Sequence, residues 1–132
     1  MLIRVDLQSR TPLEDQLRAQ IRELIALGKL VEGQSLPSTR QLAADLAVHF
    51  NTVARAYRRL EEEGLLVIGR GRGVFVKAVP SRPQSVRATR EALSSRLRQI
   101  FVDARLIGLS EAQTHEYLLD ELQQFARKEK RS

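Results

Sequence analysis

Residues 37–65 read PSTRQLAADLAVHFNTVARAYRRLEEEGL and predict two helices joined by a very short turn. In the first helix Leu42 and Leu46 recur at helical spacing and are expected to face inward. The second helix is predicted over residues 51–63 and stops at Gly64. Two helices separated by so short a turn are typical of the helix-turn-helix motif.

The second helix has two chemically different faces. Successive residues are rotated by about 100°, and this rotation places four residues on the inner face: Val53, Ala56, Tyr57 and Leu60. The opposite face carries Asn51, Arg55, Arg58 and Glu62, with Thr52 and Arg59 on one flank. The exposed face is therefore basic and amide-bearing at its start and acidic in its last turn, at Glu61–Glu63.

Another helix precedes this pair, and two short strands follow it. Residues 11–28 carry an apolar stripe and end at Gly28, and residues 29–36 are predicted to be an extended connection that turns at Gly33. The stripe consists of Leu13, Leu17, Ile21, Leu24 and Ile25. The apolar runs LLVIG (65–69) and GVFV (73–76) flank a glycine-bearing turn and predict a β-hairpin.

Three helix starts carry the sequence of a capping box, in which a hydroxyl residue is followed three positions later by Glu or Gln. These pairs are Thr11 with Glu14, Ser38 with Gln41, and Ser110 with Gln113. Pro12 is expected at the first position of its helix, where its missing N–H costs nothing.

The last third of the chain predicts two amphipathic helices after a linker rich in proline and serine. Their apolar faces comprise Leu93, Leu97, Ile100, Phe101, Ala104 and Ile107 in one, and Leu118, Leu119, Leu122, Phe125 and Ala126 in the other. Two helices alone enclose little core, so we expect a second copy to cover them. The dimerisation residues predicted on this basis are Phe101, Ile107, Leu118, Leu122 and Phe125.

The predicted fold class is mainly α with a small β-hairpin: a winged helix-turn-helix domain followed by a two-helix dimerisation tail. The predicted boundaries are residues 1–78 for the winged helix-turn-helix domain, 79–87 for the linker and 88–132 for the C-terminal dimerisation region.

Composition excludes several function classes. The 132 residues include no cysteine, which removes disulfides, thiolate metal sites and a cysteine nucleophile. The longest run without Asp, Glu, Lys or Arg spans nine residues, Leu46 to Ala54, whereas a membrane span needs about 20 apolar residues. We therefore expect a cytoplasmic protein with no membrane contact. The net charge of +6 is compatible with an anionic partner, although both parts of the chain share it.

DNA explains the polarity of the helix at 51–63. A recognition helix inserts its N-terminal residues into the major groove, where arginine pairs with guanine and asparagine with adenine. Arg40, in the first turn of the preceding helix, is expected at the DNA backbone. The hairpin tip offers Arg70 and Arg72 around Gly71 for a narrow minor groove. Solvated charged faces and hairpins kept soluble by charge are the simpler alternatives for these features.

The stretch LPSTRQLAADLAVHFNTVARAYRRLEEEGLLVIGRGRGVFV (36–76) resembles the DNA-binding domain of the GntR family of bacterial transcription regulators. The matching pattern runs Leu-Pro-Ser-x-Arg, Thr-Val, Leu-Glu-x-Glu-Gly-Leu and Gly-Arg-Gly-x-Phe-Val. NTVARAY with a two-helix tail is similar to the YtrA subfamily. The resemblance covers residues 2–78 by motif and the tail by length and helix count.

The resemblance implies a homodimer that represses a neighbouring operon, often one for a transporter, by binding an operator in double-stranded DNA. It implies that Arg40, Asn51, Thr52 and Arg55 lie at the DNA, with the wing around Gly71 in the minor groove. Two positions depart from the family pattern. His49 is a poorer N-cap than serine or asparagine and is left without a role, and Phe50 is interpreted as packing or as a thymine-methyl contact.

Catalysis finds little support in the sequence. His49 and His115 are the only histidines and are not spaced for a metal site, and GRGRG is followed by no Gly-Lys-Ser/Thr. We expect no enzyme activity, no cofactor and no metal. A winged-helix module that binds protein rather than specific DNA is the main alternative, and a small hydrolase or transferase is the other. The sequence identifies no effector, leaves repression against activation open, and leaves the operator sequence unknown.

Overall fold

A computed structural model of the chain describes residues 3–69, 71–77 and 83–130, with side chains in the last range from residue 89 onward. The elements are α1 (Leu13–Ala26), β1 (Ser35–Leu36), α2 (Thr39–Leu46), α3 (Phe50–Glu62), β2 (Leu66–Gly69), β3 (Gly73–Val76), α4 (Pro83–Leu106) and α5 (Glu111–Lys130). They form two compact units, Met1–Val79 and Pro80–Ser132. This architecture confirms the predicted class, mainly α with a small antiparallel sheet.

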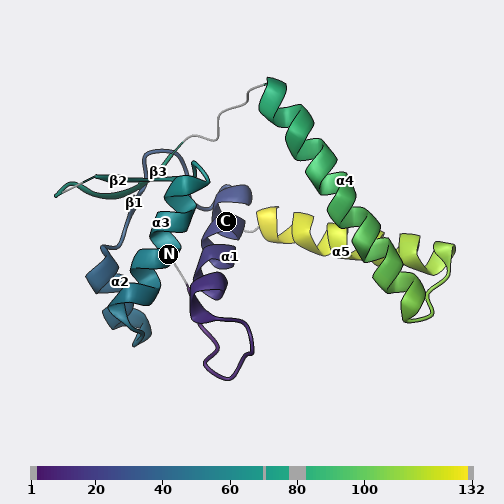
Figure 1. The fold of residues 1–132 in the computed structure, drawn as a ribbon, viewed down its shortest axis with the longest axis horizontal. Helices are drawn as coiled ribbons and strands as arrows, with labels where there is room; N and C mark the ends of the chain where they lie inside the picture. The colour runs from purple at the N-terminus through teal and green to yellow at the C-terminus, as the bar shows by residue number, and fades with distance from the viewer. Residues whose placement is uncertain (1–2, 70, 78–82, 131–132) are drawn as a thin grey trace. The chain divides into compact units, whose positions relative to one another are not determined.

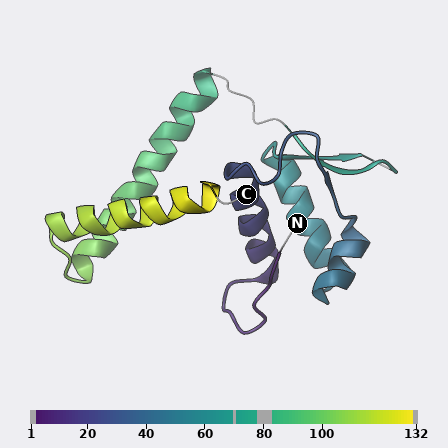
Figure 2. The same cartoon turned by 180° about the vertical axis from the view of Figure 1, so that it is seen from behind.

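Helix α3 is the centre of the first unit. It packs against α1 and α2, and its C-terminal end leads into the small sheet (Figure 1), a grouping that is also visible from behind (Figure 2). The largest fully buried side chains are Leu17, Ile21, Val53, Tyr57, Leu60 and Leu66. Leu46 is half-buried and packs against this core. The helical period of apolar residues therefore predicted the inner faces of α1 and α3 correctly.

The sheet has three strands rather than the predicted two. Its order is β1-β3-β2 with both pairings antiparallel, and Ser35 and Leu36 pair with Phe75 and Val74. The connection expected over residues 29–36 thus ends as an edge strand that buries Leu36. A strand of two residues is too short to show alternation, so its sequence carries no strand signal.

The Tyr57 side chain, 1% exposed, reaches from α3 to the start of α2. Its hydroxyl donates a 2.8 Å hydrogen bond to the carbonyl oxygen of Pro37. Burial raises the pKa of Tyr57 above the ordinary value for tyrosine. The neutral phenol is therefore the form that the folded protein stabilises.

The three predicted capping boxes have different outcomes. Ser110 and Gln113 form a complete box, with Ser110 N donating to Gln113 Oε1 at 2.9 Å and Gln113 N donating to Ser110 Oγ at 3.2 Å. Only half of the second box forms, because Ser38 Oγ accepts from Gln41 N while the Gln41 amide binds Asp45.

The box predicted at Thr11 and Glu14 is wrong. Pro12 is the N-cap of α1, one residue before the position predicted for it, and no side chain caps this helix. The Glu14 carboxylate instead lies beside Arg55 and Arg59 of α3. These partners are distant in sequence, so the local pattern could not indicate them.

The N-terminal segment is held to α1 by two glutamine side chains. Gln20 accepts a hydrogen bond from Arg4 N and donates one to Arg4 O, and Gln16 pairs in the same way with the backbone of Asp6. Ile3 is buried in the core as a result.

The second unit consists of α4 and α5, which turn into each other at Gly108 with φ +98°. Helix α4 begins at Pro83, inside the segment 79–87 that the sequence predicted as linker. Proline is well suited to the first position of a helix, so the residues that suggested a linker are compatible with a helix start. Among the described side chains of this unit only Ala104 is buried.

Candidate nucleic-acid interface

Helix α3 begins at Phe50, one residue before the predicted start, because His49 caps it. The His49 Nδ1 atom accepts a 3.1 Å hydrogen bond from Asn51 N. A neutral imidazole has one unprotonated nitrogen that can act as an N-cap acceptor, which gives a role to a residue that the sequence left without one. Phe50 is 46% exposed and lies outside the core, so packing accounts for only part of this side chain.

The exposed face of α3 follows the predicted division. Asn51, Arg55 and Arg58 are exposed and Thr52 is half-buried, all within the first nine residues of the helix. Their spacing brings them onto one side, opposite the buried Val53 and Tyr57. The structure therefore gathers an amide, a hydroxyl and two guanidinium groups along the first nine of the thirteen residues of α3.

Two further predicted residues lie on neighbouring elements of the same unit. Arg40 is exposed in the first turn of α2. Gly71 has φ +73° in the turn between β2 and β3, a left-handed conformation that suits glycine, and Arg72 beside it is exposed. Arg70, the remaining predicted wing residue, lies outside the described residues.

Three of these cations have no ion pair within the described part of the first unit. Within residues 3–69 and 71–77, no carboxylate pairs with Arg40, Arg58 or Arg72, whereas Arg55 pairs with Glu14. Their positive charge is therefore available to an external anion.

The acidic end of α3 is occupied within the fold. Glu61 Oε2 accepts a 3.1 Å hydrogen bond from Ile68 N in β2, and Glu63 Oε1 lies 3.9 Å from Arg18 and 3.8 Å from Arg22 of α1. The sequence indicated an acidic last turn but no partners for these glutamates. The i, i+4 spacing of Arg18 and Arg22 was the available signal for an acidic partner.

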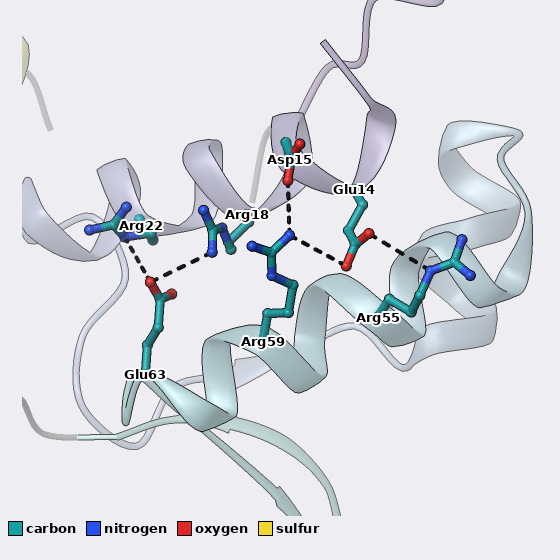
Figure 3. A network of polar contacts seen from close by, with 7 residues as sticks. All are labelled: Glu14, Asp15, Arg18, Arg22, Arg55, Arg59 and Glu63. Atoms are coloured by element: carbon teal, nitrogen blue, oxygen red, sulfur yellow. Dashed lines mark hydrogen bonds and ion pairs between the residues drawn. The ribbon is translucent and has the colours of Figure 1, made fainter.

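A second group of ion pairs joins the middle of α3 to the first turn of α1 (Figure 3). Arg59 Nη1 donates a 3.0 Å hydrogen bond to Asp15 Oδ1 and lies 3.7 Å from Glu14 Oε1. Arg55 Nε lies 3.8 Å from Glu14 Oε2. Arg59, predicted on the flank of the helix, therefore faces α1. Sequence reasoning missed this contact because its partners are 44 residues apart.

Comparison with known proteins supplies the family. Residues 13–76 match the pattern of the bacterial regulatory proteins of the gntR family. The HTH-type transcriptional repressor YtrA of Bacillus subtilis is 32% identical over 117 residues, which span 89% of this chain and 89% of that protein. The chain belongs to the GntR family.

Solved structures share the fold of this GntR-family chain. A transcriptional antiterminator from Listeria monocytogenes matches with a TM-score of 0.79 and 25% identity, over 95% of this chain and 92% of that one. The DNA-binding domain of AraR in complex with operator ORX1 matches with a TM-score of 0.52 and 27% identity, over 58% of this chain and 98% of that one. The identity to the Bacillus subtilis repressor confirms the predicted resemblance to the YtrA subfamily, and the solved structures confirm the predicted winged-helix class.

The family and its relatives are transcription regulators rather than enzymes, in agreement with the prediction from sequence. Among the described residues, no three His, Asp or Glu side chains are grouped closely enough to hold a metal ion. No helix in the described ranges is long and apolar enough to cross a membrane.

The tail of this GntR-family regulator exposes the apolar residues predicted for dimerisation. Ile107 is 78% exposed and Leu122 is 62% exposed, while Phe101 and Phe125 are each about two-fifths exposed and Leu118 is half-buried. Large apolar patches on a single chain commonly mark an interaction surface.

Proposed function

We propose that this GntR-family regulator binds a specific operator duplex, with the N-terminal half of α3 in the major groove. The observation that carries the proposal is the shared exposed face of Asn51, Arg55 and Arg58. Asparagine and arginine are the side chains that read adenine and guanine edges bidentately. Glu61 and Glu63, at the other end of α3, already have partners in β2 and α1, so the basic part of the helix is the part that can meet DNA.

Backbone and minor-groove contacts complete the proposed interface. Arg40 and Thr52 are assigned to phosphates beside the major groove, and the turn at Gly71 and Arg72 to the adjacent minor groove. Arginine in a narrow minor groove responds to the strong negative potential there. The AraR domain, whose structure was determined with an operator, supports this mode of binding as a likeness of fold.

We also propose that residues 88–132 form a homodimer through the exposed faces of α4 and α5. Two helices that bury only Ala104 among their described side chains need a partner to cover the rest. A two-fold dimer presents two recognition helices to related half-sites, so the operator should be a palindrome. Repression is proposed by similarity to YtrA of Bacillus subtilis.

Selection of bound duplexes from random DNA by the full chain tests the proposal directly. The expected product is an inverted repeat whose half-sites are spaced by about 34–36 Å or its multiples. If the affinity falls steeply with salt concentration and shows no sequence preference, the proposal of specific recognition is wrong. Absence of duplex binding would favour a winged-helix module that binds protein.

If the full chain sediments as a monomer in analytical ultracentrifugation at micromolar concentration, the proposed dimer and the proposed palindromic operator are both wrong. A promoter fusion carrying the selected sequence then separates repression from activation, since a repressor lowers reporter output when the chain is present.

A further inference from the structure

The side chain of Glu14 lies between two arginines of α3 and divides its oxygens between them (Figure 3). Oε2 is 3.8 Å from Arg55 Nε, and Oε1 is 3.7 Å from Arg59 Nη1. The Glu14 side chain is 23% exposed, whereas that of Arg55 is 58% exposed. One carboxylate at the start of α1 thus faces a residue proposed to read DNA.

The nitrogen of Arg55 that contacts Glu14 determines which N–H donors of the guanidinium remain for a DNA base. The contact is made by Nε, the guanidinium nitrogen nearest the backbone, and the two terminal nitrogens point away from Glu14 (Figure 3). Bidentate recognition of guanine needs a pair of parallel N–H donors. The ion pair therefore engages the guanidinium at Nε, and both terminal nitrogens have no partner among residues 3–69 and 71–77.

We propose that Glu14 is a positioning residue for base recognition, which holds Arg55 by Nε with its terminal nitrogens directed at a base edge. This inference rests on the proposed function and assigns part of its sequence specificity to a residue outside the helix-turn-helix. Arginine has many rotamers, and holding one of them before binding reduces the entropy lost on the DNA. Base discrimination therefore depends on an α1 carboxylate.

The same carboxylate has an opposite effect on general affinity. A negative charge near the duplex repels phosphates irrespective of sequence. Removing the charge of Glu14 should therefore strengthen binding to any duplex and weaken the preference for one base pair. A residue that only stabilised the fold would not produce these two effects together.

Asp15 provides a matched control in the same turn of α1. Its carboxylate hydrogen bonds to Arg59 and has no ion pair with Arg55. Asp15→Asn removes the same charge from the neighbouring position, so it shares the general electrostatic effect and leaves the Arg55 contact intact.

The experiment measures anisotropy of the full chain, and of its Glu14→Gln, Asp15→Asn and Arg55→Ala variants, on the duplex that the wild type selects and on a scrambled duplex. Each variant also goes through the selection from random DNA. In Glu14→Gln the operator-to-scrambled affinity ratio is expected to fall by about fivefold or more, a loss within the range of one bidentate base contact. Its preference should relax at the same base pair as in Arg55→Ala, whereas Asp15→Asn should retain it.

Two combined variants sharpen the result. Glu14→Gln should add no further loss of discrimination to Arg55→Ala, because the residue that it positions is already gone. Its effect should multiply with that of Arg58→Ala, since Arg58 has no ion pair with Glu14 and independent sites are additive in free energy. A further loss on the Arg55→Ala background would assign Glu14 to some other step and overturn the inference.

The outcomes separate the two proposals. A wild type that selects no sequence overturns the proposed function and this inference with it. A wild type that selects an operator, with Glu14→Gln keeping the preference at the Arg55 base pair, overturns only the role of Glu14. Circular dichroism and thermal unfolding verify that each variant compared is folded, and Glu14→Ala serves as a second variant at the position.

Discussion

The Tyr57 hydroxyl donates a hydrogen bond to the carbonyl oxygen of Pro37, 2.8 Å away, and so ties α3 to the residue just before the cap of α2. The two helices of the motif are thereby joined by a side chain as well as by the turn between them. Tyr57 also fills the centre of the core with its ring. One residue on the inner face thus fixes the position of the helix whose outer face is proposed to read DNA.

Tyr57→Phe should keep the ring packed and remove only this hydrogen bond. The expected loss in the free energy of unfolding is about 1–2 kcal/mol, because the Pro37 carbonyl loses its partner in a partly buried place. Urea denaturation followed by circular dichroism measures the change. Tyr117→Phe, at a position that is 59% exposed, is the control and should change stability by less than about 0.5 kcal/mol.

The raised pKa of Tyr57 predicts a dependence of stability on alkaline pH. A group whose pKa is higher in the folded state binds its proton more tightly there, so its stabilisation is complete below the unfolded pKa of about 10. Above that pH the unfolded chain releases the proton first, and the free energy of unfolding should fall. Tyr57→Phe should lack this component, so the stability difference between the two proteins should narrow above about pH 10. A constant difference through that range would contradict the prediction.

Asn51→Ala should damage specific binding more than general binding. The Asn51 side chain is exposed, and its backbone N–H keeps the bond to His49 in the variant. We expect a loss of about 1–3 kcal/mol on the selected operator and little change on a scrambled duplex. Glu62→Ala, on the same face in the last turn, is the control that should retain discrimination. If anisotropy shows equal losses of affinity on both duplexes, Asn51 contacts the DNA backbone or lies outside the interface.

Arg40→Ala and Arg72→Ala should change the salt dependence of binding rather than base preference. Each phosphate contact removed lowers the slope of log affinity against log salt by about 0.9. Weakening by Arg72→Ala should also depend on the A·T content of the flanking sequence, as expected for a minor-groove arginine. Arg90→Ala removes one exposed charge from α4 and should leave the slope unchanged. The assignment fails if the double variant Arg40→Ala/Arg72→Ala has the wild-type slope.

A variant that ends at residue 79 should fold as a monomer and bind one half-site weakly. The first unit has its own core and makes its own helix and sheet contacts, so it does not need the tail to fold. Without the tail the second half-site no longer binds intramolecularly, and the gain in effective concentration is lost. Ultracentrifugation and titration of half-site and full-site duplexes measure both effects. If the truncated chain binds the full-site duplex as tightly as the full-length chain does, the tail does not join the DNA-binding domains of two copies.

Periodicity explains why much of the fold could be predicted from sequence. Val53, Tyr57 and Leu60 recur at helical spacing, and the structure buries all three. Contacts between elements carry no such local signal. The Glu14 carboxylate meets arginines about 40 residues further along the chain, and β1 is defined by its pairing with β3 rather than by its own two residues.

The exposed site residues were predicted for the same reason as the core, since the outer face of a helix is the complement of the inner one. What the period could not indicate is which charged groups find partners inside the fold. Arg58 remains free of ion pairs within residues 3–69 and 71–77, whereas Arg59 is held by α1. Adjacent arginines in the sequence therefore have different neighbours because of where α1 lies.

The two glutamines that hold the N-terminal segment are spaced along α1 by nearly the same distance as the two residues that they bind. Gln16 and Gln20 are four residues apart, about 6 Å along α1. They pair with residues that are two apart, a separation that spans about 6.6 Å when the backbone is extended. Each amide offers both a donor and an acceptor, so the pair replaces a neighbouring β-strand for Arg4 and Asp6. The pairing fixes the register of this segment, and a slip by one residue would turn Ile3 out of the core and bring a charged side chain inward. The spacing of side chains on α1 thus sets the register of the N-terminal segment in the way that a neighbouring strand sets the register of a strand in a sheet.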